Sequence, residues 1–176
     1  MYETNEIKIW PDSNCYLRKG IECIARMCTN VDIKQDYLFI DFSAPNLRLF
    51  TNNEWIDRLR TSGLKIILIC DSIMEPLAEY WVLRDKRIYT AIYTDCNISK
   101  VLEMLTLSAY CSHTSYMRKI KRLNREEVFH IDLSLRGHSP IQISQILKLT
   151  VKKVYNIKQA INRKLRKDIG KIMLNQ

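Results

Sequence analysis

A four-residue turn in the last third of the chain constrains the fold most strongly. Gly137 ends an apolar helical pattern, and Ser139 and Pro140 follow after one intervening residue. Glycine readily adopts the left-handed backbone that often ends a helix, whereas serine followed by proline is typical of a helix start. The sequence therefore predicts two helices, over about 124–135 and 140–147, joined by a tight turn.

A third helix is predicted over 151–166, with Thr150 as its N-cap. Its apolar residues form one stripe that faces a core: Val154, Ile157, Ile161 and Leu165. The other side carries amides and cations of the kinds that read base edges and hold phosphates: Lys152, Lys153, Tyr155, Asn156, Lys158, Gln159 and Arg163. For this helix alone, a solvated polar face is an equal alternative. A fourth helix is expected over 168–174.

Basic residues are concentrated in the same part of the chain. Residues 111–176 contain 15 Lys and Arg against 4 Asp and Glu, whereas residues 1–110 contain 13 against 15. The net charge of +9 therefore comes entirely from the last third, as expected for a surface that contacts phosphates. Charge alone leaves two alternatives open, a solvated basic surface and a patch for anionic lipid.

The first 110 residues alternate short apolar runs with helical patterns, which favours βαβ units around a mostly parallel sheet. Strands are expected over 7–10, 37–42, 65–70 and 88–93, and helices over 15–27, 53–60 and 75–83. Another helix is expected from Ser99 as its N-cap. The predicted organisation is an α/β domain over 1–110, a linker over 111–121 and an all-α four-helix domain over 122–176.

Several classes of protein are excluded by what the sequence lacks. The first ten residues have no signal-peptide pattern, and the longest apolar run, 66–70, is too short for a membrane span. We therefore expect a cytoplasmic protein. With no phosphate-binding Gly-rich loop and no hydrolase or metalloprotease motif, we expect no enzyme, cofactor or metal. The six cysteines are interpreted as reduced thiols, with a redox sensor as the alternative. Surface or half-buried positions are expected for His113, His130 and His138.

Residues 123–165 resemble the C-terminal domain of LuxR/NarL-type response regulators. The family's pattern is matched by Leu123, Glu127, Gly137, Ser139, Ile143, Leu147, Thr150, Val154, Lys164 and Leu165. The sequence departs from it at His130, at Leu135 and Arg136, and at Lys153.

This resemblance implies a helix-turn-helix that binds double-stranded DNA. It implies that Tyr155, Asn156 and Gln159 face bases, and that Lys152, Lys153 and Lys158 lie near the sugar-phosphate backbone. Arg163 and Lys164 complete the predicted DNA-binding set. The fourth helix resembles the family's dimerisation helix through Ile169, Ile172 and Met173.

The first domain resembles the receiver domain that precedes such a module. Asp41 ends a predicted strand with Pro45 four residues later, as at a phospho-accepting aspartate. A working receiver also needs a second acid for Mg²⁺ and a lysine for the phosphoryl oxygens, where this chain has Ser13 and Thr94. Asp12 remains, and Cys70-Asp71 stands at the switch position. We predict a phosphorylation-independent pseudo-receiver, with an atypical working receiver, or a purely loop-capping Asp41, as alternatives.

Segments 52–55 and 77–81 resemble those of enterobacterial fimbrial-operon regulators of the EcpR (MatA) type. Together these resemblances imply a sequence-specific, nucleoid-associated regulator, an activator of surface-structure or virulence genes, that acts as a dimer. One alternative is an auxiliary regulator that works only as a heterodimer with another response regulator.

Overall fold

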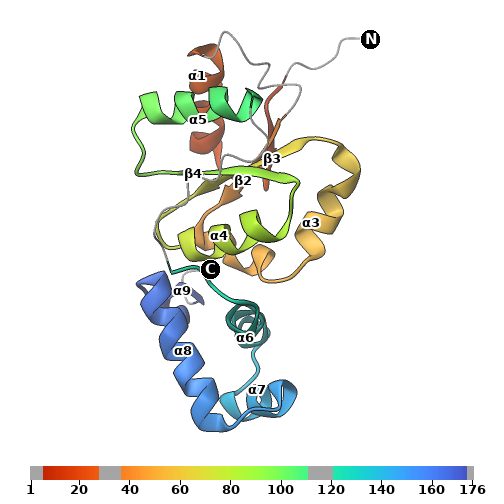
Figure 1. Cartoon of the computed structure of the whole chain (residues 1–176), viewed down its shortest axis with the longest axis vertical. Coiled ribbons are helices and arrows are strands. Elements are labelled where there is room, and N and C mark those ends of the chain that lie inside the picture. Colours follow the sequence, from red (N-terminus) through yellow and green to blue (C-terminus); the bar gives the residue numbers. More distant parts are fainter. Residues whose placement is uncertain (1–5, 28–36, 111–120, 174–176) are drawn as a thin grey trace.

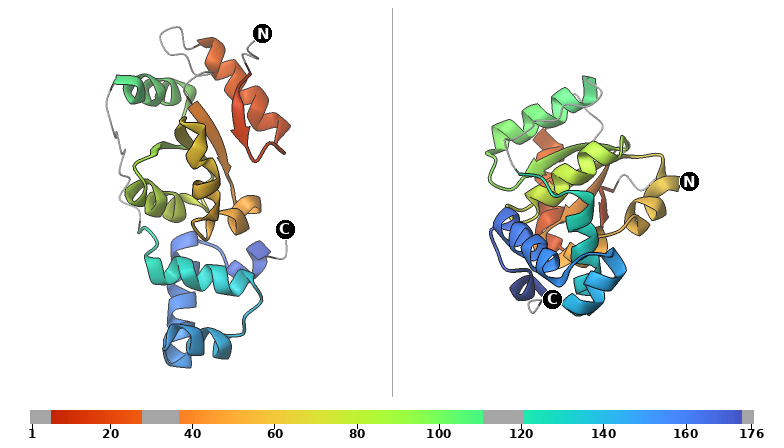
Figure 2. Two further views of the ribbon diagram at one scale, coloured as in Figure 1. Left: turned by 90° about the vertical axis from the view of Figure 1, so that its right-hand side faces the viewer. Right: turned by 60° about the horizontal axis from the view of Figure 1, so that its bottom comes forward.

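The computed structural model describes residues 6–27, 37–110 and 121–173, which form two units. Residues 6–27 and 37–110 make an α/β unit. Residues 121–173 make a helical unit, which follows the α/β unit along the long axis of the molecule (Figure 1, Figure 2). The predicted linker, apart from residue 121, lies outside the described residues. In the described ranges, none of the helices has both the length and the apolar character that a membrane span requires.

The α/β unit is built on a parallel sheet, as predicted. Its strands lie in the order β1-β2-β3-β4, and each pair of neighbours is parallel. Their bounds are β1 Lys8–Trp10, β2 Tyr37–Phe42, β3 Lys65–Cys70 and β4 Ile88–Tyr93. The apolar runs that predicted these strands are continuous because both faces of the sheet are covered.

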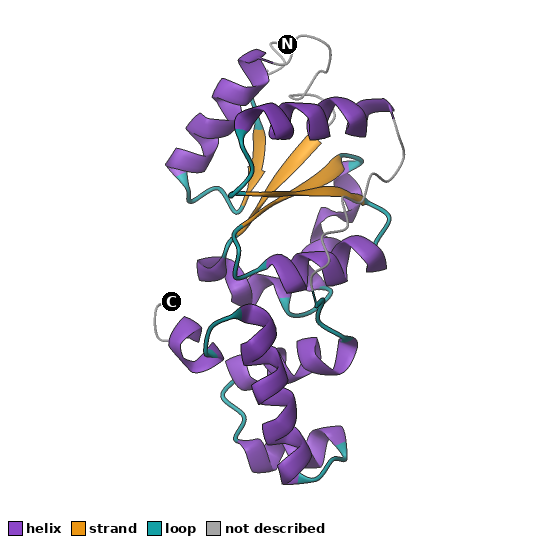
Figure 3. Cartoon of the chain, turned by 60° about the vertical axis from the view of Figure 1, so that its left-hand side comes forward, coloured by secondary structure: helices purple, strands orange, loops and turns teal. Residues whose placement is uncertain are grey.

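Helices cover the two faces of the sheet (Figure 3). Alternate residues of a strand point to opposite faces, so Tyr37 and Phe39 pack with α1 (Cys15–Met27) and α5 (Ile98–Tyr110). Leu38 and Ile40 pack into the opposite core. That core is closed by η1 (Ala44–Phe50), α3 (Glu54–Arg58), η2 (Leu59–Ser62) and α4 (Glu75–Arg84).

Two local predictions in the α/β unit need correction. Helix α5 begins one residue before Ser99, and the side chain of Asn97 accepts the hydrogen bond from the amide of Lys100 (2.9 Å). Asparagine is therefore the N-cap, which its short acceptor side chain favours as strongly as serine does. The helix expected over 53–60 is two shorter pieces, α3 and η2, which end at Gly63 with a positive φ of 66°.

The helical unit contains α6 (Arg125–Leu135), α7 (Pro140–Leu147), α8 (Val151–Leu165) and α9 (Ile169–Met173). Capping boxes begin the first two: Asn124 pairs with Glu127, and Ser139 pairs with Gln142. Gly137 has a φ of 86°, as expected for the turn between α6 and α7. On α7, Ile143 is buried, whereas Ile146 is 45% exposed.

The two units share one hydrophobic core. Buried Leu123, Ile131 and Ile161 of the helical unit belong to the same cluster as Leu77 and Trp81 of α4. Hydrogen bonds reinforce this junction. The Leu123 amide donates to the Pro76 carbonyl oxygen (3.0 Å), and Arg48 donates to the Leu135 carbonyl oxygen (3.0 Å). The α/β unit thus holds the helical unit in a defined orientation.

Candidate nucleic-acid interface

Helix α8 presents one buried face and one exposed face. Its N-cap is Thr150, whose hydroxyl accepts from the Lys153 amide (3.3 Å). The predicted apolar stripe is buried, with exposed fractions from 0 to 8% for Val154, Ile157, Ile161 and Leu165. Because that stripe is fixed against the core, the opposite face is directed to solvent.

The packing of α7 determines where the first turn of α8 lies. Ile143 of α7 and Leu133 of α6 form a small buried cluster with Val154 of α8. Leu149, in the turn between α7 and α8, is half-buried against it. Lys148 ends α7 in the left-handed conformation, with a φ of 54°. This tight turn brings the start of α8 to the surface beside α7.

Seven of the eight residues predicted to bind DNA lie on the exposed face of α8. They are Lys152, Lys153, Tyr155, Asn156, Lys158, Gln159 and Arg163. Tyr155 is 51% exposed although its ring is large and partly apolar. The face therefore offers an aromatic ring and two amides between cations.

Lys164 differs from these seven residues. Its side chain is 20% exposed, and its ammonium group lies 2.7 Å from Glu127 Oε2 and 3.0 Å from the Arg122 carbonyl oxygen. Glu127 is buried and also accepts from the Asn124 amide (2.7 Å). The ammonium group of Lys164 therefore connects α8 to the start of α6 in this structure.

The first turn of α8 has an unusual charge. It contains no acidic residue, although acids are favoured there by the helix dipole, and it carries Lys152 and Lys153. Lys153 Nζ lies 3.9 Å from Glu126 Oε1, and both side chains are about half exposed. Such a pair contributes little, so the positive end of the helix is left available to an anion.

His130 lies behind this face, on the buried side of α6. It was expected at the surface or half-buried, but only 2% of it is exposed, whereas His138 is half-buried as expected. His113 lies outside the described residues. Burial, and then the nearby charge of Lys158, lower the pKa of His130. The sequence did not predict the burial of His130, because its apolar neighbours form a pattern that does not distinguish this position from the others.

Asp41 lies at the carboxyl edge of the sheet, where the side-chain amide of Asn14 donates to its carboxylate and that of Asn46 to its backbone oxygen. It is 4% exposed, and Asn14 donates to its Oδ2 from 3.2 Å. Asp12 instead forms an ion pair with Arg18 at 2.6 Å. Thr94 is exposed, with its amide bound to the Cys70 carbonyl oxygen (3.0 Å).

The neighbouring loop acid has a clear structural role. Asp71 accepts from the amides of Ala44 (2.7 Å), Ile73 and Met74. In the described parts of the chain, no three His, Cys, Asp or Glu side chains are grouped so that they could hold a metal ion.

Comparisons with known proteins identify the first unit. Residues 2–109 match the family model described as the EcpR N-terminal domain. The chain belongs to the EcpR N-terminal domain family. It is 28% identical over 170 residues to the uncharacterized protein YqeH of Escherichia coli (strain K12), covering 94% of this chain and 79% of YqeH.

The fold of this EcpR-family chain is also found in a solved structure of two RcsB dimers bound to two parallel DNAs. The TM-score is 0.56 at 17% identity, and the match covers 93% of each chain. The shared fold therefore extends over both units. The expected resemblance to a regulator of the EcpR type with a receiver-like first unit is confirmed.

Proposed function

We propose that this chain is a transcription regulator, without catalytic activity, that binds double-stranded DNA sequence-specifically through α8. In this proposal residues 122–176 form a LuxR-type helix-turn-helix domain, joined by a linker over 111–121 to a receiver-like domain over 1–110. The observation that carries it is the exposed row of cations and amides on α8, set opposite a fully buried stripe. An α-helix fits the major groove of duplex DNA, and the RcsB fold has been solved with DNA.

Within this face, we assign different roles to amides and cations. Asn156 and Gln159 read bases, since a side-chain amide can pair with both N6 and N7 of adenine, and Tyr155 packs against a base edge beside them. The cations hold phosphates: Lys152, Lys153, Lys158 and Arg163. Lys164 contributes mainly by fixing α8 on α6, through Glu127.

The test is a titration of the purified full chain with a selected duplex and its single-base variants, at several salt concentrations. Gln159→Ala should relax preference at one base position, by about 1–3 kcal/mol. Lys153→Ala should weaken every sequence alike and reduce the salt slope by about one unit. Lys19→Ala, an exposed lysine of α1, is the matched control and should change neither quantity. Equal losses for every sequence in both α8 variants would show that this helix does not read bases.

We propose that the regulator binds DNA as a dimer, as in the RcsB structure. A gel shift with this chain alone, and with a second response regulator added, separates a homodimer from a heterodimer. A shift that requires the second protein would assign the chain an auxiliary role.

We further propose that regulation does not depend on phosphorylation of Asp41. Support comes from the amide of Asn14 at Asp41 and from the engagement of Asp12 by Arg18. We also propose that the regulator acts at the nucleoid as an activator of surface-structure or virulence genes. Genome-wide mapping of bound DNA, with transcript levels in a deletion strain, tests both its targets and the sign of its effect.

A further inference from the structure

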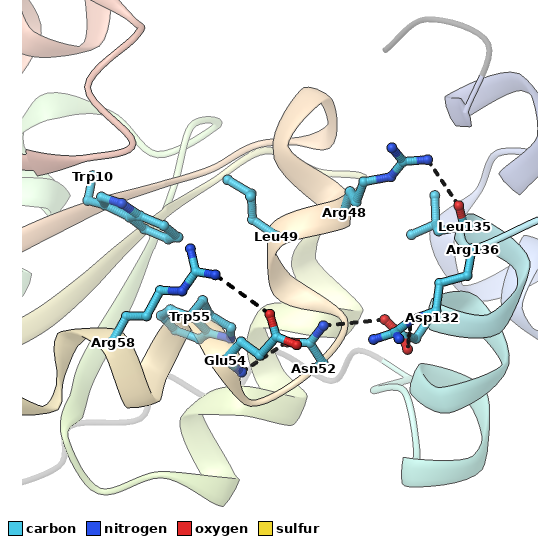
Figure 4. Close-up of a pocket in the computed structure, with 10 residues that line it drawn as sticks. All are labelled: Trp10, Arg48, Leu49, Asn52, Glu54, Trp55, Arg58, Asp132, Leu135 and Arg136. Carbon is cyan, nitrogen blue, oxygen red and sulfur yellow. Dashed lines mark hydrogen bonds and ion pairs between the residues drawn. The ribbon is translucent and has the colours of Figure 1, made fainter.

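A pocket of about 560 Å³ opens at the junction between the two units. Figure 4 shows that Trp10, Arg48 and Arg58 of the α/β unit face Asp132 and Arg136 of the helical unit across it. The proposed DNA-binding face of α8 does not line this pocket. It is therefore a separate place where a small molecule could contact both units at once.

The charges lining the pocket do not balance. It contains three arginines and two acids. Asp132 is engaged, since Arg136 Nε lies 2.8 Å from its Oδ2, whereas Arg58 and Glu54 are 3.7 Å apart and mostly exposed. Arg48 donates one bond to the neutral carbonyl oxygen of Leu135. Its guanidinium has five N–H donors, so most of its donors and its whole charge remain available to an anion.

Another part of the lining is apolar and aromatic. Trp10 is half-buried and packs edge-on against Phe50, with ring centroids 6.0 Å apart. Leu49 is 37% exposed, although side chains of its kind are usually covered. Trp55 also lines the pocket, and its indole Nε1 is buried with no hydrogen-bond partner among the described residues.

We propose that this pocket binds a small aromatic monocarboxylate. Its ring lies against Trp10 and Leu49, and its carboxylate meets the guanidinium of Arg48, while Arg58, beside Trp10 in Figure 4, adds to the positive charge of the pocket. Arginine forks pair with both carboxylate and phosphate, but three arginines against two acids leave about one positive charge. One negative charge on the ligand matches that excess, whereas a dianionic phosphate would face Glu54 and Asp132 with charge uncompensated.

Ligand binding and the junction are thermodynamically linked. Arg48 and Asp132 belong to different units, so the complete pocket exists only while the units are packed together. A ligand that binds only the packed state stabilises that state by mass action. The inference does not depend on DNA binding, because both readouts below are measured without DNA.

The test uses calorimetric titration and thermal unfolding of the full chain with benzoate, indole-3-acetate and naphthalene-1-acetate. Each is paired with its neutral amide, which keeps the ring and removes the charge. At least one carboxylate should bind at millimolar concentration or below and raise the unfolding temperature, while its amide should not. Arg48→Met and Arg58→Met should each weaken binding, the former by about tenfold or more. Arg26→Met, an exposed arginine of α1, is the matched control.

Three outcomes would overturn the proposal: no binding of any of the three carboxylates, equal binding of a carboxylate and its amide, or unchanged affinity in Arg48→Met. Arg48→Lys keeps the charge but not the fork, and should bind with intermediate affinity. If Arg48→Met does not fold, because it also loses the bond to Leu135, then Arg58→Met decides, since the partner of Arg58 is in its own helix.

Discussion

Two buried aspartates, one in each unit, have opposite surroundings. Asp41 at the sheet edge is 4% exposed, and its carboxylate accepts from Asn14 at 3.2 Å. Asp132 at the junction is 7% exposed. It accepts from Thr51 (2.8 Å) and Asn52 (3.5 Å) of the α/β unit, and pairs with Arg136 at 2.8 Å.

The comparison shows that an acid's role is decided by its partners. Asp41 matches a motif that predicts a phospho-acceptor, yet among the described residues its carboxylate forms no ion pair and accepts from the side-chain amide of Asn14. Asp132 belongs to no motif, yet its carboxylate joins the two units. A buried carboxylate with three donors stabilises a particular arrangement, whereas one with a single amide partner contributes much less.

The largest expected effect lies in the aromatic cluster beside the junction. Trp81 of α4 is 2% exposed, packs edge-on against Trp55 (5.4 Å), and donates from Nε1 to the Phe50 carbonyl oxygen (2.8 Å). Trp81→Ala should lower the free energy of unfolding by about 3–5 kcal/mol, measured by urea denaturation. Tyr16→Ala, at a residue that is 84% exposed, should change it by less than about 0.5 kcal/mol. Similar losses of unfolding free energy in Trp81→Ala and Tyr16→Ala would mean that the junction is not a hydrophobic core.

A smaller effect is expected from the junction carboxylate itself. Asp132→Asn replaces one acceptor oxygen with a donor and removes the charge that Arg136 contacts. It should therefore cost about 1–3 kcal/mol. Asp41→Asn keeps an acceptor for its one amide partner and should cost less than about 1 kcal/mol. Urea denaturation of the two variants side by side tests the comparison directly. If Asp41→Asn costs more, the assigned roles are reversed.

The pH dependence of stability near neutrality should come from His130 of α6. Since burial lowers the pKa of His130 below its ordinary value of 6.5, the unfolded chain takes up the proton first as pH falls. Stability should be level above about pH 6.5 and should decline below it, towards the lowered folded pKa. For one proton the slope is at most about 1.4 kcal/mol per pH unit.

The matched variants for this prediction are His130→Gln and His138→Gln. Denaturant midpoints between about pH 5 and 8 should lose this slope in His130→Gln. His138 is half-buried, and its variant should keep the slope. A slope that survives in His130→Gln would assign the titration to another group.

Most secondary structure could be predicted because the spacing of apolar residues along the sequence agrees with which residues are buried in the folded chain. Strands β2, β3 and β4 and helices α1 and α7 have the predicted bounds, and the buried stripe of α8 follows from its spacing alone. The spacing separates the two faces of α8, but the family resemblance, rather than periodicity, indicated that the exposed face contacts DNA. The DNA contacts themselves remain predictions.

The junction could not be predicted, for a physical reason. Arg48 and Leu135 are 87 positions apart, and Thr51 and Asp132 are 81 apart, so no local pattern relates them. The burial of His130 and the inward turn of Lys164 depend on the same packing between elements. Asn97 caps α5 in place of the predicted Ser99; both residue types are good N-caps, and a two-residue shift in a helix start leaves its apolar pattern almost unchanged.

The smallest expected effect is the absence of phosphorylation at the sheet edge. Phosphoryl transfer to Asp41 would need Mg²⁺ held by neighbouring oxygens and a cation for the transferred group. Here Asn14 donates to the Asp41 carboxylate, Arg18 pairs with Asp12, and Thr94 is predicted to stand in place of the receiver's lysine. Acetyl phosphate with Mg²⁺ should therefore leave the intact mass and the DNA affinity of the full chain unchanged. The informative second variant is Thr94→Lys with Ser13→Asp, which restores both missing charges. A gain of phosphorylation in this variant, lost again on adding Asp41→Asn, would show that those two positions had silenced the site. Stoichiometric mass gain in the unmodified sequence, abolished by Asp41→Asn, would instead show that this edge of the sheet is a working phospho-acceptor.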